Sequence, residues 1–313
     1  MSKLDEKTQE LMDDILKLKE KNDFLILAHN YQVPEVQEIA DFCADSLKLA
    51  EFAKNADSAN NMIFAAVYFM AESGAILNPT KNVYISNYEA LCPMARRAPE
   101  KLMKKVKETN PEIPLMMYIN TTAAARAQAD YICTSANAVK IAKIINKPII
   151  NFAPDKNMAY FIQSKLNITV NPIPLKGCCI VHEKFEASYI KKVKKEHPKA
   201  MILAHPECRP EVQAIADYIG STSQMEKHVI NSDHDEFIIA TEIGLLQKIE
   251  RLTDSKKIYK AHNNPVCYNM KKNTLESLKY VMEKQPKEFL VTVPEDIAER
   301  NKILLNEMIK NSQ

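Results

Sequence analysis

Short apolar runs alternate with amphipathic segments along most of the chain, a pattern typical of parallel sheets covered by helices on both faces. The runs that predict buried strands lie at 24–28, 62–67, 83–85, 115–119, 148–152, 168–170, 200–204, 236–240 and 257–259. Apolar residues recur at helical spacing between them. These segments predict helices over 1–23, 34–43, 47–54, 71–77, 123–129, 138–145, 155–163, 211–218, 225–230, 242–249, 275–283 and from Pro294 onward.

One stretch of the chain occurs twice. Residues 26–41 and 202–217 are identical at eleven of sixteen positions without a gap, and a fainter copy lies at 116–131. One cysteine follows each copy at an equivalent position. The spacings between these cysteines are 87 and 88 residues. A period of this length suits a small domain that is present three times.

We therefore predict an α/β protein of three homologous three-layer α/β/α domains with parallel sheets, in a pseudo-threefold arrangement around a central site. The predicted boundaries are 1–106 with the N-terminal helix, 107–195, and 196–313 with the C-terminal helices. Ligands of parallel sheets bind beyond the carboxyl ends of the strands. If these edges face the axis, each unit contributes side chains to one site.

Composition narrows the function classes. A net charge of +2 gives no electrostatic case for nucleic acid. The longest wholly apolar run, 63–70, is too short to span a membrane, and the charged N-terminus lacks a signal-peptide core, so we expect a cytoplasmic protein. The four glycines form neither a dinucleotide-binding nor a Walker loop. Seven cysteines in the cytoplasm indicate metal-binding or catalytic thiols rather than disulfides.

Three of these cysteines, Cys92, Cys179 and Cys267, occupy the repeated phase. Three thiolates that meet on an axis fit an iron–sulfur cluster. A [4Fe–4S] cluster with three protein ligands leaves one iron open to substrate as a Lewis acid. For Cys43, Cys133 and Cys208, packing as small buried hydrophobes is the simpler interpretation, and Cys178 receives no role.

Hydroxyl residues recur after the repeated aspartates, at Asp45-Ser46, Thr134-Ser135 and Ser221-Thr222. Each pair is typical of a helix N-cap, and capping alone would explain it. Three helix N-termini directed at one cavity would instead bind anions through Ser46, Ser135 and Thr222 and their backbone N–H groups. This arrangement favours a small polyanionic substrate.

Further polar residues follow the predicted strands. His29 and His205 are exact counterparts in the repeat, and Tyr118 takes their place in the fainter copy. Glu207 is the best candidate for general acid–base catalysis beside an open metal, and we expect His205 and His29 to move protons with it. Tyr31, Tyr118 and Asn120 supply hydrogen bonds that orient the substrate. The remaining histidines have no counterpart and are interpreted as structural or exposed; those singled out are His182, His228, His234 and His262.

Together, these residues resemble the quinolinate synthase family of de novo NAD biosynthesis over nearly the whole length. The resemblance rests on His29-Asn30-Tyr31-Gln32, Ala40-Asp41-Phe42-x-x-Asp45-Ser46, Phe69-Met70-Ala71-Glu72, Tyr118-Ile119-Asn120, Thr134-Ser135-Ala136-Asn137, Gly177-x-Cys179-x-Val181-His182, His205-Pro206-Glu207-Cys208, Ala240-Thr241-Glu242-Ile243-Gly244 and Cys267-x-Asn269-Met270-Lys271. Two positions depart from the family pattern: Asn30 replaces a tyrosine, and Leu91-Cys92-Pro93 replaces Gly-Cys-Ser.

The resemblance implies condensation of iminoaspartate with dihydroxyacetone phosphate to quinolinate, with release of phosphate and water. It implies three α/β domains around a [4Fe–4S] cluster held by Cys92, Cys179 and Cys267. The family's substrate-contacting residues correspond to His29, Tyr31, Ser46, Tyr118, Asn120, Ser135, His205, Glu207 and Thr222. Whether a transient partner, L-aspartate oxidase, delivers the iminoaspartate stays open. The residues alone also allow a different iron–sulfur lyase or hydratase, or a non-enzymatic redox or iron sensor.

Overall fold

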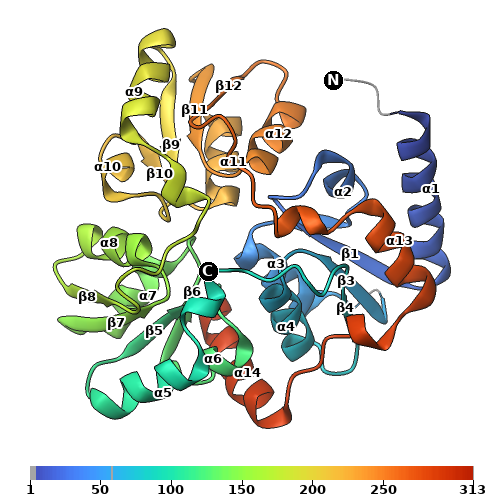
Figure 1. Cartoon of the computed structure of the whole chain (residues 1–313), viewed down its shortest axis with the longest axis horizontal. Coiled ribbons are helices and arrows are strands. Elements are labelled where there is room, and N and C mark those ends of the chain that lie inside the picture. Colours follow the sequence, from blue (N-terminus) through green and yellow to red (C-terminus); the bar gives the residue numbers. More distant parts are fainter. Residues whose placement is uncertain (1–4, 58, 313) are drawn as a thin grey trace.

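Three four-stranded parallel sheets form the framework of the protein, a computed structural model that describes residues 5–57 and 59–312. The strands are β1 (Phe24–His29), β2 (Phe42–Ala44), β3 (Asn61–Ala65), β4 (Asn82–Ile85), β5 (Leu115–Tyr118), β6 (Tyr131–Cys133), β7 (Ile149–Ala153), β8 (Thr169–Pro172), β9 (Met201–Ala204), β10 (Tyr218–Ile219), β11 (Glu236–Ala240) and β12 (Lys257–Lys260). The sheet orders are β2-β1-β3-β4, β6-β5-β7-β8 and β10-β9-β11-β12, so all three share one topology. Figure 1 shows them around a common centre with helices on their flanks, which confirms the predicted fold class.

The helices that cover the sheets lie close to the predicted ones. They are α1 (Glu6–Lys21), α2 (Pro34–Glu38), α3 (Ser46–Asn55), α4 (Tyr68–Leu77), α5 (Glu100–Thr109), α6 (Ala123–Arg126), α7 (Ala138–Ile145), α8 (Lys156–Lys165), α9 (Ala187–Glu196), α10 (Pro210–Gln213), α11 (Thr222–Asn231), α12 (Ile243–Leu252), α13 (Leu275–Lys284) and α14 (Glu295–Lys310). One-turn 3₁₀ helices follow Cys92, Cys179 and Cys267; they are η1 (Ala95–Arg97), η2 (His182–Lys184) and η3 (Met270–Lys272). Another 3₁₀ helix is η4 (Lys287–Phe289). Helices α5 and α9 are absent from the helices predicted above.

The predicted helices 34–43, 123–129 and 211–218 are too long. Helices α2, α6 and α10 each last about one turn, and the short strands β2, β6 and β10 follow them. Cys43 and Cys133 therefore lie in strands rather than in or just after helices. The repeated aspartate before each strand explains the turn, because its carboxylate accepts a hydrogen bond from the backbone N–H near the start of the unit's first strand. These bonds are 2.8 Å each and join Asp41 to Ile26, Asp130 to Leu115 and Asp217 to Ile202.

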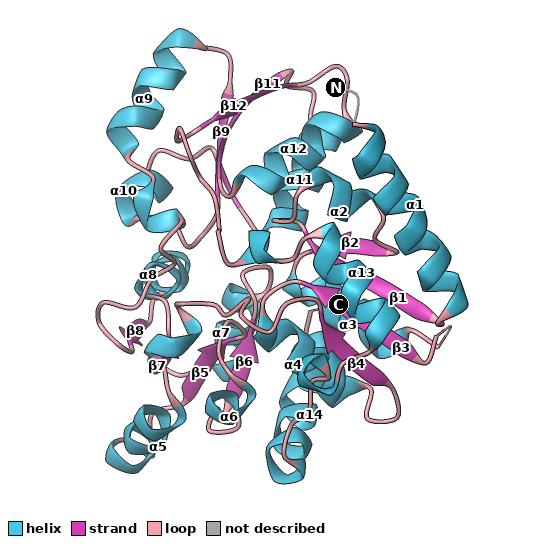
Figure 2. Ribbon diagram, turned by 45° about the vertical axis from the view of Figure 1, so that its right-hand side comes forward, coloured by secondary structure: helices cyan, strands magenta, loops and turns pink. Residues whose placement is uncertain are grey.

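The C-terminal helices leave the third unit. Leu304 and Leu305 of α14 belong to the apolar cluster that joins the first two units, and Figure 1 shows α14 between α4 and α6. Leu278 of α13 packs in the cluster that contains Ile15 of α1, and Figure 2 shows these two helices side by side. The predicted domain boundaries stay a prediction. Among the described helices, none combines the length and apolarity that a membrane crossing requires.

Each cysteine loop is attached to the start of a helix in its own unit. The residue two positions before the cysteine accepts a hydrogen bond from the first backbone N–H of α4, α8 or α12. The bonds run from Tyr68 to Ala90 (2.9 Å), from Lys156 to Gly177 (2.8 Å) and from Ile243 to Pro265 (2.9 Å). Because the first four N–H groups of a helix have no partner within it, this bond places the cysteine loop and satisfies the helix together.

We expect Gly177→Ala to destabilise the protein by at least about 2 kcal/mol, because a Cβ at residue 177 would collide with the backbone carbonyl of Pro154. Urea unfolding measures the loss. Gly220→Ala is the matched control, since its Cβ would meet mainly the ring of Tyr218, a side chain that is able to shift. Equal stability of the Gly177 variant and the wild type would contradict the tight approach of this loop.

Candidate functional site

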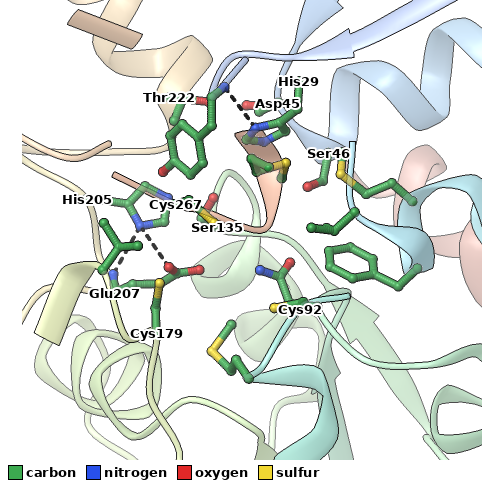
Figure 3. Close-up of a pocket in the computed structure, with 18 of the residues that line it drawn as sticks. His29, Asp45, Ser46, Cys92, Ser135, Cys179, His205, Glu207, Thr222 and Cys267 are labelled. Atoms are coloured by element: carbon green, nitrogen blue, oxygen red, sulfur yellow. Dashed lines mark hydrogen bonds and ion pairs between the residues drawn. The ribbon is translucent and has the colours of Figure 1, made fainter. Parts of the chain in front are cut away.

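One pocket at the centre of the molecule collects side chains from all three units, as Figure 3 shows for those it labels. Every residue that the sequence predicted for the site lines it: His29, Tyr31, Ser46, Cys92, Tyr118, Asn120, Ser135, Cys179, His205, Glu207, Thr222 and Cys267. The ends of the first strands and the segments after the first, second and fourth strands of each unit supply these residues. The roles predicted for them are a separate matter from their position, and remain predictions.

The three cysteines are half-buried residues that line the pocket. Burial raises the pKa of Cys92 to about 12 and that of Cys267 to about 11, and it raises the pKa of Cys179 well above the usual range. For Cys92 and Cys179, the charges of neighbouring cysteines add to the increase in pKa, whereas backbone N–H groups at η1, η2 and η3 lower the pKa of all three thiols. Buried thiols that repel one another's charge and receive N–H donors have the character of ligands to a positively charged metal group. The donor set therefore fits an iron–sulfur cluster.

Two of the cysteine loops are held by hydrogen bonds from their backbone to carboxylates. Asp155 caps α8 and accepts a hydrogen bond from the backbone N–H of Cys179, and Glu242 caps α12 and accepts one from Cys267, both at 3.1 Å. Burial raises the pKa of both carboxyl groups. In the first unit the equivalent cap position is Val67, which cannot supply such a bond. Sequence analysis did not single out Asp155.

The two equivalent histidines are neutral hydrogen-bond donors. The backbone N–H of Tyr31 donates to Nδ1 of His29 at 3.1 Å, and that of Glu207 donates to Nδ1 of His205 at 3.2 Å. Burial lowers the pKa of both imidazoles to about 3. An imidazole whose Nδ1 accepts a bond carries its proton on Nε2. Neither histidine is therefore suited to act as a base.

Glu207 is an ionised carboxylate of the pocket. The Tyr118 hydroxyl donates a hydrogen bond to Oε1 of Glu207 at 2.7 Å, and Nδ1 of His182 lies 2.7 Å from Oε2. Burial by itself raises the pKa of Glu207, but His205, His182 and the Tyr118 hydroxyl outweigh burial and hold this pKa below its usual range. Burial and the charge of Glu207 raise the pKa of Tyr118 and Tyr31, so both phenols keep their protons.

His182 is the site residue that sequence analysis missed. It is fully buried, and its ring lies parallel to that of His205 with centroids 4.5 Å apart. Its Nε2 lies 3.0 Å from the hydroxyl of Thr241, which in turn lies 2.9 Å from the hydroxyl of Tyr31. Ligand atoms of Cys179, His182 and Glu207 lie within 4.8 Å of one another and could hold a metal ion.

His182 is therefore not exposed, and its contact with Glu207 agrees with a structural role beside the pocket. Its positions in the other units are Ala95 and Met270, so the repeat contained no signal for it. The signal that could have found it is the motif Gly177-x-Cys179-x-Val181-His182, which joins it to Cys179.

Two of the three predicted helix starts are confirmed. Asp45 caps α3 through the N–H of Lys48 at 3.0 Å, and Ser221 caps α11, so Ser46 and Thr222 are first helical residues. The two caps also meet, because the Ser221 hydroxyl donates to Asp45 at 2.8 Å.

The predicted cap at Thr134-Ser135 is wrong. Helix α7 begins at Ala138, after a turn in which Asn137 accepts the N–H of Thr134 at 2.7 Å. This bond inserts one more turn before the helix, and Ser135 lies in that turn, where it still lines the pocket. The other cysteines behave as predicted where they are fully buried, at Cys133 and Cys208, whereas Cys43 and Cys178 are partly exposed.

Buried polar side chains at one phase of the repeat hold the loops that present the histidines and tyrosines. They are Gln37, Arg126 and Gln213, and each donates to two carbonyls of the loop before it. The bonds join Gln37 to Asn30 and Gln32, Arg126 to Ile119 and Thr121, and Gln213 to Pro206 and Cys208, at 2.8–3.0 Å. Gln37 also reaches Gly244 of the third unit, and Gln213 reaches Asn157 of the second.

Fold and pocket define a class: an α/β protein of three like sheets whose shared pocket joins three thiols with imidazole, phenol and carboxylate groups. Comparison with known proteins places the chain within that class. The family described as quinolinate synthetase A protein matches residues 13–310. The chain belongs to this family.

Curated relatives are similar over nearly their full length. The quinolinate synthase of Methanothermobacter thermautotrophicus is 41% identical over 304 residues, which cover 97% of this chain and 99% of the relative. That of Pyrococcus furiosus is 42% identical over 308 residues (98% and 100%), and that of Thermotoga maritima is 41% identical over 292 residues (93% and 96%). These relatives are enzymes, so both the family resemblance and the prediction of an enzyme are confirmed.

Removal of the Arg126 side chain should destabilise the protein strongly. Arg126→Met would remove the cation nearest to the partly buried Glu72 and leave two loop carbonyls without a donor, at a cost of about 3–5 kcal/mol in the free energy of unfolding. Arg300→Met is the control, because Arg300 donates only to the Ala129 carbonyl and should cost about 1 kcal/mol. Urea unfolding compares them, and similar losses would show that Arg126 has no special role in holding this loop.

Proposed function

We propose that this protein is a quinolinate synthase of NAD biosynthesis, which condenses iminoaspartate with dihydroxyacetone phosphate and releases quinolinate, phosphate and water. The observation that carries the proposal is the convergence of one cysteine from each unit on a pocket whose other walls carry hydrogen-bond donors and the ionised Glu207. Membership of the quinolinate synthetase A family supports the same reaction.

Cys92, Cys179 and Cys267 would hold a [4Fe–4S] cluster. The support is their donor chemistry and the backbone N–H groups that face each sulfur. A cluster with three protein ligands supplies one open iron as a Lewis acid when it is bound.

The anionic groups of the substrates, two carboxylates and a phosphate, need donors in a pocket with little positive charge. Ser46 and Thr222 open α3 and α11, so their backbone N–H groups and hydroxyls are available to such anions. Ser135 adds a third hydroxyl from the second unit. These residues would hold the substrates and orient the phosphate before it leaves.

Glu207 is the proposed proton acceptor. It is ionised, and condensation followed by aromatisation requires removal of protons from carbon and nitrogen. His29 and His205 would donate hydrogen bonds from Nε2 to substrate oxygens, because their Nδ1 atoms are occupied. Tyr31, Tyr118 and Asn120 would orient the carbon chain, and His182 would keep Glu207 in place.

Iminoaspartate is an imine that water hydrolyses, so an oxidase must form it from L-aspartate shortly before it is used. We infer that L-aspartate oxidase supplies it in the cytoplasm, either by diffusion or in a transient complex.

Cys179→Ala should abolish the brown chromophore and quinolinate formation, because one of three cluster ligands is lost. Anaerobic purification with iron and sulfide analysis, followed by detection of quinolinate from the two substrates, measures both. Cys178→Ala is the matched control: the adjacent thiol is absent from the pocket, so this variant should keep cluster and product. A full cluster in Cys179→Ala would refute the ligand assignment, and a wild type with cluster but without quinolinate would refute the reaction.

Glu207→Gln should keep the cluster and lose about 10²–10⁴-fold in kcat, the usual contribution of a general acid–base group. The amide conserves shape but cannot accept a proton. Glu211→Gln, on the partly exposed start of α10, should retain full activity. Steady-state rates of cluster-loaded protein test this, and a near-normal kcat for Glu207→Gln would exclude Glu207 from the chemistry.

A further inference from the structure

Asn30 lies directly behind the pocket wall, in the loop that follows β1. Its side chain is fully buried, and it does not line the pocket itself. Its amide spans two units: Nδ2 lies 2.9 Å from the hydroxyl of Thr222, and Oδ1 lies 2.9 Å from Nζ of Lys248. Thr222, by contrast, is both a pocket residue and the first residue of α11.

The chemistry of the partners settles the direction of each bond. A lysine ammonium has donors only, so the atom of Asn30 that faces Lys248 must be the carbonyl oxygen Oδ1. The NH₂ group must then face Thr222, whose hydroxyl oxygen accepts this bond. The Thr222 hydroxyl therefore keeps its own proton for a different acceptor, and the pocket is the place where one would be bound.

Lys248 is itself held in a fixed position. Its ammonium also donates to the carboxylate of Glu226 on α11 at 2.8 Å and to the backbone carbonyl of Cys43 at 2.9 Å. Three acceptors from β2, α11 and the Asn30 loop satisfy its three donors. A lysine with all its donors engaged cannot release the amide, so the orientation of Asn30 is fixed in the folded protein.

We propose that Asn30 and Lys248 are positioning residues that fix the Thr222 hydroxyl as a hydrogen-bond donor to an anionic oxygen of the substrate. The ligand chemistry is a carboxylate or phosphate oxygen, which accepts and never donates. The backbone N–H of Thr222, without a partner inside its helix, lies beside the hydroxyl and suits the same oxygen. This inference rests on the proposed function for its substrate class.

A double-mutant cycle tests the proposal on the cluster-loaded enzyme. Asn30→Asp keeps the size of the side chain but replaces the donor by an acceptor, so the Thr222 hydroxyl would turn its proton toward the introduced carboxylate and its lone pairs toward the anion. Thr222→Val removes the hydroxyl altogether. Binding of inorganic phosphate and of quinolinate is titrated separately for the wild type, both single variants and the double variant.

For one of the two anions, we expect Asn30→Asp to weaken binding about 10- to 100-fold when Thr222 is present, as for loss of a hydrogen bond to a charged group. When Asn30→Asp is combined with Thr222→Val, the remaining penalty reflects only charge repulsion and should be at least about tenfold smaller. Loss on the phosphate arm would identify a phosphate oxygen, and loss on the quinolinate arm a carboxylate. An equal penalty with and without the hydroxyl, or no penalty for either anion, would overturn the proposal.

Lys248→Met provides an independent readout, because without the ammonium the amide of Asn30 can turn over. Lys248→Met should weaken binding of the same anion as Asn30→Asp does. It should also raise the KM for the substrate that carries this anionic group more than it lowers kcat. Lys256→Met is the matched control: Lys256 is comparably buried and donates to the backbone of Ser232 and His234, away from the pocket. Unchanged KM in Lys248→Met, with the control also unchanged, would contradict the role of Lys248. Quinolinate formation by the wild type tests the proposed function separately.

Discussion

The central pocket depends on buried hydrogen bonds that tie the loop after each unit's first strand to its surroundings. Loops carry backbone polar groups that cannot be buried without partners. Gln37, Arg126 and Gln213 supply those partners at equivalent positions, and two of them also reach the neighbouring unit. Packing is tight where the units meet, since a Cβ on Gly244 would approach the Gln32 carbonyl to 2.6 Å. Without these bonds, the loop residues that line the pocket would not be held in place.

Parallel sheets place all their carboxyl ends at one edge, and this protein uses each strand end for a different purpose. The ends of the first strands and the loops after them carry hydrogen-bonding groups such as His29 and Glu207. The second strands lead toward helix starts, and the first N–H groups of the helices after the third strands hold the cysteine loops. The fourth strands lead to the thiols. One topology repeated three times thus directs equivalent strand ends at one volume.

Chemistry arises where the three units differ. Tyr118 stands where the other units have histidine, and it donates to Glu207, which has no carboxylate counterpart in the first or second unit. His182 follows only one of the three cysteines. Asn30 accepts a hydrogen bond from Lys248 and donates one to Thr222, and its positions in the other units are Ile119 and Pro206. Equivalent positions bring residues together, but a symmetric set of residues would give a pocket with no distinction between donor and acceptor walls.

The amino-acid sequence by itself determined the unit, its period and the positions that converge. Repeated phases in Cys92, Cys179 and Cys267 place equivalent residues around an axis, and apolar runs of strand length mark the sheets. Tertiary structure alone decided the short strands after Asp41, Asp130 and Asp217, the turn before α7, the membership of His182 in the site and the departure of α14 from its own unit. The placement of His182 and α14 depends on contacts between residues far apart in the chain. The short strands and the turn before α7 depend on individual hydrogen bonds made by Asp41, Asp130, Asp217 and Asn137. Neither periodicity nor local propensity contains a signal for such contacts.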